Sequence, residues 1–337
     1  MEKKEYFLGI DVSKLTLDYC LLDTQDKVLF KGVCANTHKG IAQITSALKT
    51  TGIKDLSRVL FGMENTGLYS NPFKAYAVIK GLDLVVEHPY SIAKSKGLKR
   101  GKSDAADAIM IAQYMREKLP KLRLYIPDFE IITDLKRLVS SRELLLKQQH
   151  QLDRHLKEMK GLIPKKAYDD LEENLHHSII GIKQSLTAID QQIDQLLLQD
   201  EAIHDNQKII ESIPGVGRET ALALICATNN FTSITDPRKL ACHAGVVPYV
   251  HDSGTSIKSK PRVSPFANKF LKKRLHMAAM SAVRWCQPMK LYYERKLAQG
   301  KNTMTVLNAV RNKLVHLIYA LIEKKENYNK NYINPLA

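Results

Sequence analysis

Short runs of alternating apolar and polar residues open the chain, and turn-forming residues separate them. Three such runs lie at residues 6–11, 15–22 and 27–33. A period of two is typical of strands that bury one face, so these runs predict an antiparallel meander. A helical stretch follows at 41–48, and then strand-like and helix-like segments alternate, at 58–63, 68–80 and 82–86. This order predicts a mixed sheet in an α/β domain.

The middle of the chain has a different pattern. From about residue 128 to residue 200 it loses glycine and strand-like runs and gains Leu, Gln, Glu and Lys. Apolar residues recur there at alternating spacings of four and three, at Leu175, Ile179, Ile182, Leu186, Ile189, Ile193 and Leu196. That is the heptad seam of a coiled coil. A helix over 133–160 carries a poorer stripe, which Arg142 and Gln149 interrupt. We expect the two helices to form an antiparallel hairpin turning at 161–164, or one of them to contribute to dimerisation.

Length and composition limit the class of protein. With 337 residues, of which 44% are apolar, the chain is expected to form two or three folded domains, and we place them at 1–127, 128–204 and 205–337. No apolar run of membrane-spanning length and no signal-peptide pattern is found in the sequence, so we expect a cytoplasmic protein without a membrane partner. Five scattered cysteines favour reduced thiols over a disulfide framework or a zinc site.

Charge narrows the choice of partner. Fifty-one Lys and Arg against 35 Asp and Glu give a net charge of +16, which favours a polyanion such as nucleic acid. Between residues 253 and 293 there is no acid, and nine basic residues stand there, at Lys258, Lys260, Arg262, Lys269, Lys272, Lys273, Arg274, Arg284 and Lys290. We expect a helix from Lys269 onward to lie along a phosphate backbone. The alternative is a solvated basic face.

A second basic cluster runs directly into two aspartates spaced three apart. The basic residues are Lys94, Lys96, Lys99, Arg100 and Lys102. Ser103 can cap the helix that follows, which places Asp104 and Asp107 in its first turn and on one face. Carboxylates that close repel each other, and a bound divalent cation would relieve the repulsion. The alternative is that both aspartates only interact with the helix dipole.

Two further acids stand at strand ends. Asp11 and Glu64 each follow a predicted strand at its carboxyl end, where open α/β sheets bind ligands. With Asp104 and Asp107 they could form one group of four acids. Such a group would hold Mg²⁺ or Mn²⁺ through carboxylate oxygens.

The last third of the chain has two loops with candidate chemistry. Gly215 and Gly217 form a tight turn before a helix, and its exposed N–H groups can bind a phosphate; the turn resembles the hairpin of helix-hairpin-helix DNA-binding motifs, although such turns also arise for structural reasons. Ser253 lies in a turn-forming sequence beside the basic helix. Its hydroxyl could attack phosphorus if His251, Asp252 or the metal cluster took its proton, or it could simply cap the backbone.

Taken together, these segments resemble a known family. They are Gly9-Ile-Asp-Val-Ser-Lys14, Gly62-Met-Glu-Asn-Thr-Gly67, Lys102-Ser-Asp-Ala-Ala-Asp107, Ile213-Pro-Gly-Val-Gly217 and Ala244-Gly-Val-Val-Pro248 with Ser253-Gly254. The family is that of the DEDD insertion-sequence transposases related to the Piv pilin-gene invertases. The resemblance implies a RuvC-like domain of the ribonuclease H fold, a coiled-coil arm and a mainly helical transposase domain.

The resemblance also implies a mechanism. Asp11, Glu64, Asp104 and Asp107 match the acidic tetrad of the family, and Ser253 matches its catalytic serine. By this resemblance we expect double-stranded donor and target DNA, a structured guide RNA (the bridge RNA), and a nucleoid-associated homo-oligomer, a dimer or tetramer, that shares active sites. The chain departs from the usual pattern after the serine, where Pro265 and Ala267 replace the common Lys and Gly.

Three other functional hypotheses compete with that of a recombinase. Sugar kinases and actin-like ATPases also begin with Gly-Ile-Asp on a first strand, but the glycine-rich phosphate loop that they need is missing at residues 12–14. A RuvC-type junction nuclease would use the acids and water without a serine. A binding protein without catalysis would need only the basic surface.

Overall fold

The chain divides into two compact units, Met1–Pro127 and Asp128–Ala337. The computed structural model describes residues 4–95, 104–249, 252–253, 257–258, 262–263 and 266–331, with the backbone alone for Asp104, Ser253 and a few others. The division falls after Pro127. The predicted arm and C-terminal domain belong to a single unit, because they share one core.

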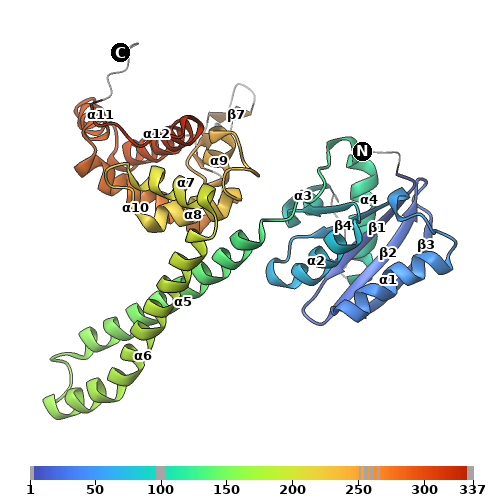
Figure 1. The fold of residues 1–337 in the computed structure, drawn as a ribbon, viewed down its shortest axis with the longest axis horizontal. Helices are drawn as coiled ribbons and strands as arrows, with labels where there is room; N and C mark the ends of the chain where they lie inside the picture. Colours follow the sequence, from blue (N-terminus) through green and yellow to red (C-terminus); the bar gives the residue numbers. More distant parts are fainter. Residues whose placement is uncertain are drawn as a thin grey trace. The chain divides into compact units, whose positions relative to one another are not determined.

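A five-stranded sheet forms the centre of the first unit (Figure 1). Its strands are β1 (Tyr6–Val12), β2 (Thr16–Asp23), β3 (Val28–Ala35), β4 (Val59–Glu64) and β5 (Leu84–Glu87), in the order β3-β2-β1-β4-β5. The first three strands are antiparallel, and β4 and β5 run parallel to β1. The predicted meander and the mixed sheet are confirmed.

Helices cover both faces of this sheet because its strands are apolar on both sides. One face packs against α1 (His38–Thr50) and α2 (Asn71–Lys80), and the other against α3 (Pro89–Ser95) and α4 (Asp104–Lys118). Short 3₁₀ turns lie at Leu56–Arg58, Gly67–Ser70 and Leu119–Lys121. Thr37 begins α1 by accepting a hydrogen bond from the backbone N–H of Gly40 through its side chain, as an N-cap residue does.

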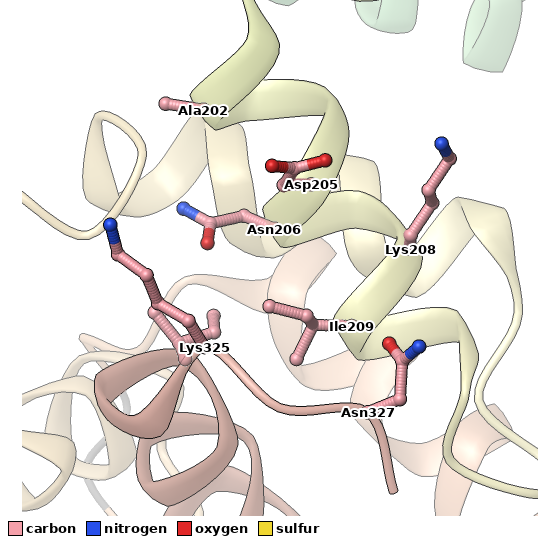
Figure 2. A pocket seen from close by; sticks show the side chains of 8 residues that line it. Ala202, Asp205, Asn206, Lys208, Ile209, Lys325 and Asn327 are labelled. Atoms are coloured by element: carbon pink, nitrogen blue, oxygen red, sulfur yellow. The ribbon is translucent and has the colours of Figure 1, made fainter.

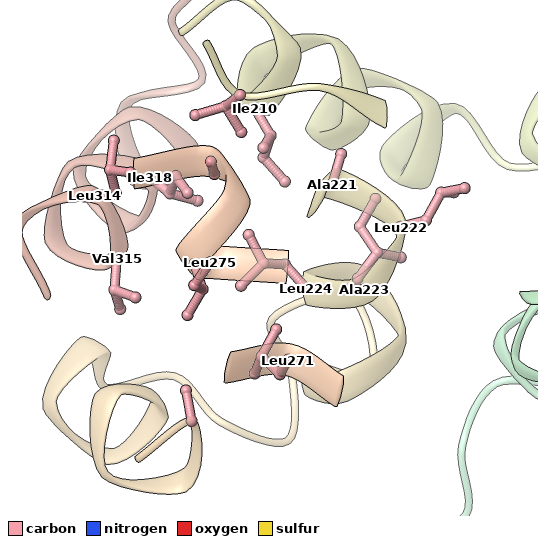
Figure 3. Packing of buried hydrophobic residues seen from close by; sticks show 14 of the residues in the cluster. Ile210, Ala221, Leu222, Ala223, Leu224, Leu271, Leu275, Leu314, Val315 and Ile318 are labelled. Carbon is pink, nitrogen blue, oxygen red and sulfur yellow. The ribbon is translucent and has the colours of Figure 1, made fainter. Parts of the chain in front are cut away.

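The second unit is helical. Two long helices, α5 (Glu130–Met159) and α6 (Lys165–Leu198), form the predicted hairpin, which we call the arm (Figure 1). The remaining helices form what we call the helical body: α7 (Glu201–Glu211), α8 (Arg218–Thr228), α9 (Pro237–His243), α10 (Lys269–Trp285), α11 (Gln287–Ala298) and α12 (Thr303–Lys324). Leucines and isoleucines of α7, α8, α10 and α12 interlock in its core (Figure 3).

Only the root of the arm takes part in that core. Ile132, Leu135 and Val139 of α5 and Ile193 and Leu197 of α6 are buried there. None of the residues 140–192, all of which the structure describes, is buried. The heptad seam of α6 is therefore only partly covered by α5, and coiled-coil packing along it stays a prediction.

A network of ion pairs also joins the arm to the helical body. Arg142, which interrupts the stripe of α5, contacts Asp190 of α6 at 2.8 Å and Glu219 of α8 at 2.7 Å. Glu143 accepts from Lys273 at 2.7 Å and from Arg274 at 2.6 Å, both on α10. Burial opposes ionisation of Glu143, but the hydrogen bond from Lys273 and the charges of the basic residues around it outweigh that effect and lower its pKa. The interruption of the apolar stripe thus has a structural reason.

All five cysteines are free thiols, and four of them are buried. This agrees with the prediction of reduced core thiols. Burial raises the pKa of Cys226 to about 12, which makes it a poor nucleophile. Among the helices that the structure describes, none combines the length and apolar character needed to cross a membrane.

Candidate active site

Asp11 and Glu64 stand side by side on one face of the sheet. Ile10 of β1 is the register partner of Met63 of β4, so Asp11 and Glu64 follow as neighbours in adjacent parallel strands. Side chains alternate between faces along a strand. Phe7 and Leu60 pack in the core under α4, and Asp11 and Glu64, an even number of residues further on, point to the same face. Both lie at or next to the last residue of their strand, a little earlier than predicted.

Two acids that the sequence analysis did not select extend this pair into a row. Asp18 of β2 is the register partner of Asp11, and Glu87 of β5 is the register partner of Glu64. Register partners share a face, so four carboxylates cross the sheet at one level. Neighbouring strands are about 5 Å apart. Two like charges at about 5 Å repel by about 3 kcal/mol at an effective dielectric of 20, so a row of this kind attracts cations.

Helix α4 packs on the face of the sheet that carries the row, and Asp107 lies in its first turn. A Cβ added at Gly9 would stand 2.1 Å from the carbonyl oxygen of Ala108 and 2.5 Å from the backbone nitrogen of Ala112. Gly9 is therefore the place where α4 touches the sheet, because only a glycine allows the two backbones to approach so closely. Asp107 precedes Ala108 in the first turn of α4, and Asp11 lies two residues beyond Gly9.

A hydrogen bond fixes α4 at the other end of the row. The hydroxyl of Tyr114 on α4 donates to Glu87 at 3.3 Å. Burial, and next the charge of Glu87, raise the pKa of Tyr114, so its hydroxyl remains a donor at neutral pH. The sequence alone gave no signal for this contact, because 27 residues separate the partners.

Some predicted residues near this row lie outside the described part of the chain. These are Lys96, Lys99, Arg100 and Lys102, and for Asp104 only the backbone is described, at the first position of α4. Lys94 is exposed near the end of α3. Among the residues that are described, no three His, Cys, Asp or Glu side chains form a group able to hold a metal ion. Carboxylate oxygens are nonetheless the donors that Mg²⁺ and Mn²⁺ prefer, so the chemistry of the row fits such an ion.

Ser253 belongs to a set of short strand pairs in the second unit. Its backbone lies in β7 (Asp252–Ser253), which pairs with β8 (Ile257–Lys258), and β6 (Pro248–Tyr249) pairs with β9 (Arg262–Val263). We call these four strands the serine ribbon. The side chains of Ser253, Lys258 and Arg262 lie outside the described part, as do His251 and Lys260.

The base of the serine ribbon is fastened to α12. Asn308 donates from Nδ2 to the carbonyl of Val246 at 2.7 Å, two residues before β6 begins. Arg311 donates to Asn308 at 3.3 Å and contacts Nδ1 of His276 on α10 at 2.9 Å. Arg311 is buried, which is costly for a guanidinium, and these contacts hold it in place.

The basic helix α10 does not offer all its cations to a ligand. Lys269 is exposed and Lys272 is half-buried, as expected for contacts with phosphates. Arg274, in contrast, has a side chain only 14% exposed between Glu143 and Glu219, and Lys273 also pairs with Glu143. These contacts give Arg274 a structural role, and they differ from the nucleic-acid contact that the sequence suggested.

The glycine turn before α8 is also packed rather than open. Gly215 has a φ of +88°, and a Cβ there would stand 2.6 Å from the backbone nitrogen of Ala282 on α10. Gly217 is the N-cap residue of α8, and Glu219 in its first turn pairs with Arg142 and Arg274. The carboxylate of Glu219 already complements the positive end of α8. The structure thus gives Gly215 a packing reason, and the phosphate contact stays a prediction.

A shallow hollow of about 400 Å³ lies on the helical body beside α7 and the end of α12 (Figure 2). Lys208 and Lys325 line it together with Asp205. The single acid partly balances the two cations, and Ile209 and Ile322 form an apolar part of the wall. This mixture does not resemble a track for phosphates, so we do not add the hollow to the nucleic-acid surface.

Comparisons with known proteins cover both units. A family profile described as a transposase matches residues 8–160, and one described as "Transposase IS116/IS110/IS902 family" matches residues 207–294. The pilin gene-inverting protein of Moraxella bovis is 27% identical over 331 residues, which cover 96% of this chain and 98% of that protein. The transposase of insertion sequence element IS1111A from Coxiella burnetii is 22% identical over 95% of this chain and 90% of that protein.

A solved structure, "T. thermophilus RuvC in complex with Holliday junction substrate", aligns with 36% of this chain and 99% of its own at 14% identity and a TM-score of 0.28, a likeness too low to support a conclusion. The two family profiles, in contrast to this structure, carry an argument. Together they span the row of acids, the arm's first helix, the serine ribbon and α10, in chain order. The chain therefore belongs to the IS110/IS116/IS902 family of transposases, relatives of the pilin gene-inverting proteins.

Proposed function

We propose that this protein is a site-specific DNA recombinase that cuts and rejoins strands with metal ions and a serine nucleophile. The observation that carries the proposal is the pairing of Asp11 with Glu64 on the sheet face that α4 covers, with Asp107 in the first turn of α4. Acids grouped in this way would attract cations, and a phosphodiester is a substrate that metal ions on carboxylates suit. The net charge of +16 supports a nucleic-acid substrate.

Asp11, Glu64, Asp107 and Asp104 would hold Mg²⁺ or Mn²⁺ through their carboxylate oxygens. A bound divalent ion supplies Lewis-acid stabilisation of the charge that develops on phosphate oxygens. The chain's own contribution would be to fix the acids: the sheet register supports a pairing of Asp11 with Glu64, and the contact of α4 with Gly9 would hold the turn that carries Asp107.

Ser253 would act as the nucleophile. Its Oγ gives its proton to a nearby base, such as His251 or Asp252, and forms a bond to phosphorus. The bond from phosphorus to one sugar oxygen breaks, and that oxygen takes a proton and leaves as a hydroxyl. The phosphoserine bond conserves the energy of the phosphodiester, so a second DNA hydroxyl can reverse the step and join a new strand. The fastening of Val246 to Asn308 holds the chain where the segment that leads to Ser253 begins, which suits this role.

By the resemblance, the partners are double-stranded donor and target DNA, a structured guide RNA and further copies of this chain, as a dimer or tetramer in the cytoplasm near the nucleoid. The exposed Lys94 and Lys269 and the half-buried Lys272 are available for phosphates. The partly covered seam of the arm supports association of copies, because apolar residues there remain accessible.

The first experiment removes a metal ligand. We expect Asp11→Asn to abolish strand cleavage in Mg²⁺ while binding to DNA persists, since the acid acts on the reaction and not on the backbone contacts. The matched control is Glu117→Gln, which changes an exposed acid on α4 and should cleave like the wild type. Equal loss of binding and cleavage in Asp11→Asn would show that the acid is only structural.

The second experiment separates a recombinase from a junction nuclease. Denaturing electrophoresis of the protein with labelled DNA should show a covalent adduct, and peptide mapping should find it at Ser253. Ser253→Ala should lose both the adduct and strand exchange. Cleavage that survives in Ser253→Ala without any adduct would instead indicate a hydrolytic nuclease that uses water.

A further inference from the structure

Three large apolar side chains are exposed where β1 and β4 end. Leu15, in the turn between β1 and β2, is 74% exposed. Leu68 and Tyr69, in the 3₁₀ turn after β4, are 78% and 46% exposed. Both turns directly follow the strands that carry Asp11 and Glu64. We call Leu15, Leu68 and Tyr69 the apolar rim.

A single asparagine fastens the two turns to each other. Nδ2 of Asn36 donates to the carbonyl of Ser13 at 3.0 Å and to the carbonyl of Tyr69 at 2.9 Å. The backbone N–H of Asn36 donates to the carbonyl of Leu15 at 2.8 Å. The first turn is also closed internally, because the hydroxyls of Ser13 and Thr16 lie 2.8 Å apart. The apolar rim is thus held on fixed backbone.

The second turn is closed in the same way. Ser70 is fully buried, and its Oγ accepts from the backbone N–H of Thr66 at 2.9 Å and contacts the hydroxyl of Thr66 at 2.8 Å. Glu64 ends β4 two residues before Thr66. The hydrogen bonds that shape this turn therefore leave Leu68 and Tyr69 outward and exposed. A rigid apolar surface loses little conformational entropy when a ligand covers it.

Single exposed apolar residues are ordinary, but three on one fixed edge require a reason. The ligand that this edge fits is set by its neighbours. On one side lies the row of acids, which takes phosphates only through cations. On another is Lys14, an exposed cation next to Leu15. A nucleotide offers both parts: a phosphate for the cations and a flat apolar base for the leucines and the tyrosine.

We propose that the apolar rim receives an unpaired DNA base next to the phosphate that is cut. This inference rests on the proposed function, since it places the strand across Asp11 and Glu64. A base in a duplex has both faces covered by its neighbours, so the apolar rim can cover a base only when that base has left its stack. The protein would accordingly favour DNA that is unpaired at the cut.

The test compares two probes with the full-length protein. One is a duplex with a short unpaired bubble of thymines, and the other is the same duplex fully paired. Stacking of a base on a side chain changes affinity roughly tenfold, so we expect the wild type to prefer the bubble by about that factor. Leu68→Ser and Tyr69→Ser should each remove most of the preference, and Ile79→Ser, a matched change at a 70% exposed position on α2, should not.

A second measurement locates the base. With 5-iododeoxyuridine in the bubble, ultraviolet light should crosslink the DNA to a peptide that contains Tyr69. Equal affinity for both probes, or a crosslink confined to the helical body, would overturn the inference. A third result would also overturn it. If Leu68→Ser turned the oligomer into a monomer in sedimentation and kept the preference for the bubble, the apolar rim would be a contact between copies.

Cleavage is recorded in the same samples. If the protein cuts DNA but does not prefer the bubble, the proposed function stands and the role of the apolar rim is refuted. If the protein prefers the bubble but cuts no DNA in Mg²⁺, base binding at the apolar rim stands and the proposed function is refuted. Folding of the variants is expected to be normal, because substitutions at exposed positions change stability little.

Discussion

The contact between Gly9 and α4 allows a sharp test with a built-in control. Gly9 and Gly62 are register partners on adjacent strands, and both face α4. A Cβ at Gly9 would meet backbone, the Ala108 carbonyl oxygen at 2.1 Å, whereas a Cβ at Gly62 would meet the side chain of Met115, its Sδ at 2.0 Å. Gly9→Ala must therefore move the helix that carries Asp107, and Gly62→Ala needs only a new rotamer of Met115.

The size of the effect follows from the distances. An ordinary contact is 3.4 Å or more, so α4 must retreat by about 1.3 Å in Gly9→Ala. A displacement of about 1 Å at a reacting group lowers rate by about 100-fold. Overpacking lowers the free energy of unfolding by about 1–3 kcal/mol, and both variants share this loss.

The assay measures Mg²⁺-dependent cleavage per folded molecule, with folding followed by urea denaturation. We expect Gly9→Ala to cleave about 100-fold more slowly and Gly62→Ala to stay close to the wild type, at similar stability. If both variants lose cleavage equally, or if Gly9→Ala keeps full activity, the position of α4 does not control the acids and this reasoning is refuted.

Three other predictions concern single contacts. Arg274→Met should lower the free energy of unfolding by about 3 kcal/mol, because Glu143 and Glu219 lose a buried partner, and should leave the salt dependence of DNA binding unchanged. Lys272→Gln should instead reduce the slope of log affinity against log salt by about 0.9, with little change in stability. Denaturation and salt titration that gave the opposite pattern for the two variants would contradict the structure. Burial lowers the pKa of His243, and burial together with Arg311 lowers the pKa of His276, from the usual 6.5. The unfolded chain then takes up protons first, so the urea midpoint should fall as the pH drops below about 6.5, less so in His276→Gln; a midpoint that rises toward acid pH would disprove this. Tyr114→Phe removes the hydrogen bond to Glu87 and should cost about 1 kcal/mol in denaturation and slow cleavage; unchanged cleavage would mean that this bond does not orient α4.

The sequence predicted the elements of the sheet well because alternation with a period of two is local. It also placed Asp11 and Glu64 at strand ends, since each ends an apolar run, and their role stays a prediction. It missed Asp18 and Glu87 because their importance depends on register, and register joins residues that are distant in the chain. Nothing in the run 15–22 shows that Asp18 will face Asp11.

Charge patterns were a weaker guide than apolar patterns. The segment around Arg274 contains no acid, yet Arg274 is neutralised by Glu143 and Glu219, which come from helices elsewhere in the chain. The pattern at Gly215 was equally ambiguous, because a pair of glycines can bind a ligand or allow a close helix contact. Only the structure shows the close contact with Ala282. Exposed apolar residues such as Leu68 give no sequence signal, since a leucine in a turn looks the same whether it is covered or not.

The arm has a consequence for how this protein could vary. Its outer residues, 144–188, are not part of the core that stabilises the second unit. Adding or deleting seven residues in each helix would lengthen or shorten the arm by about 10.5 Å and preserve the phase of its seam. Evolution or an engineer can therefore adjust the span of this hairpin, or attach a cargo at the exposed Leu162, without disturbing the fold of the remainder.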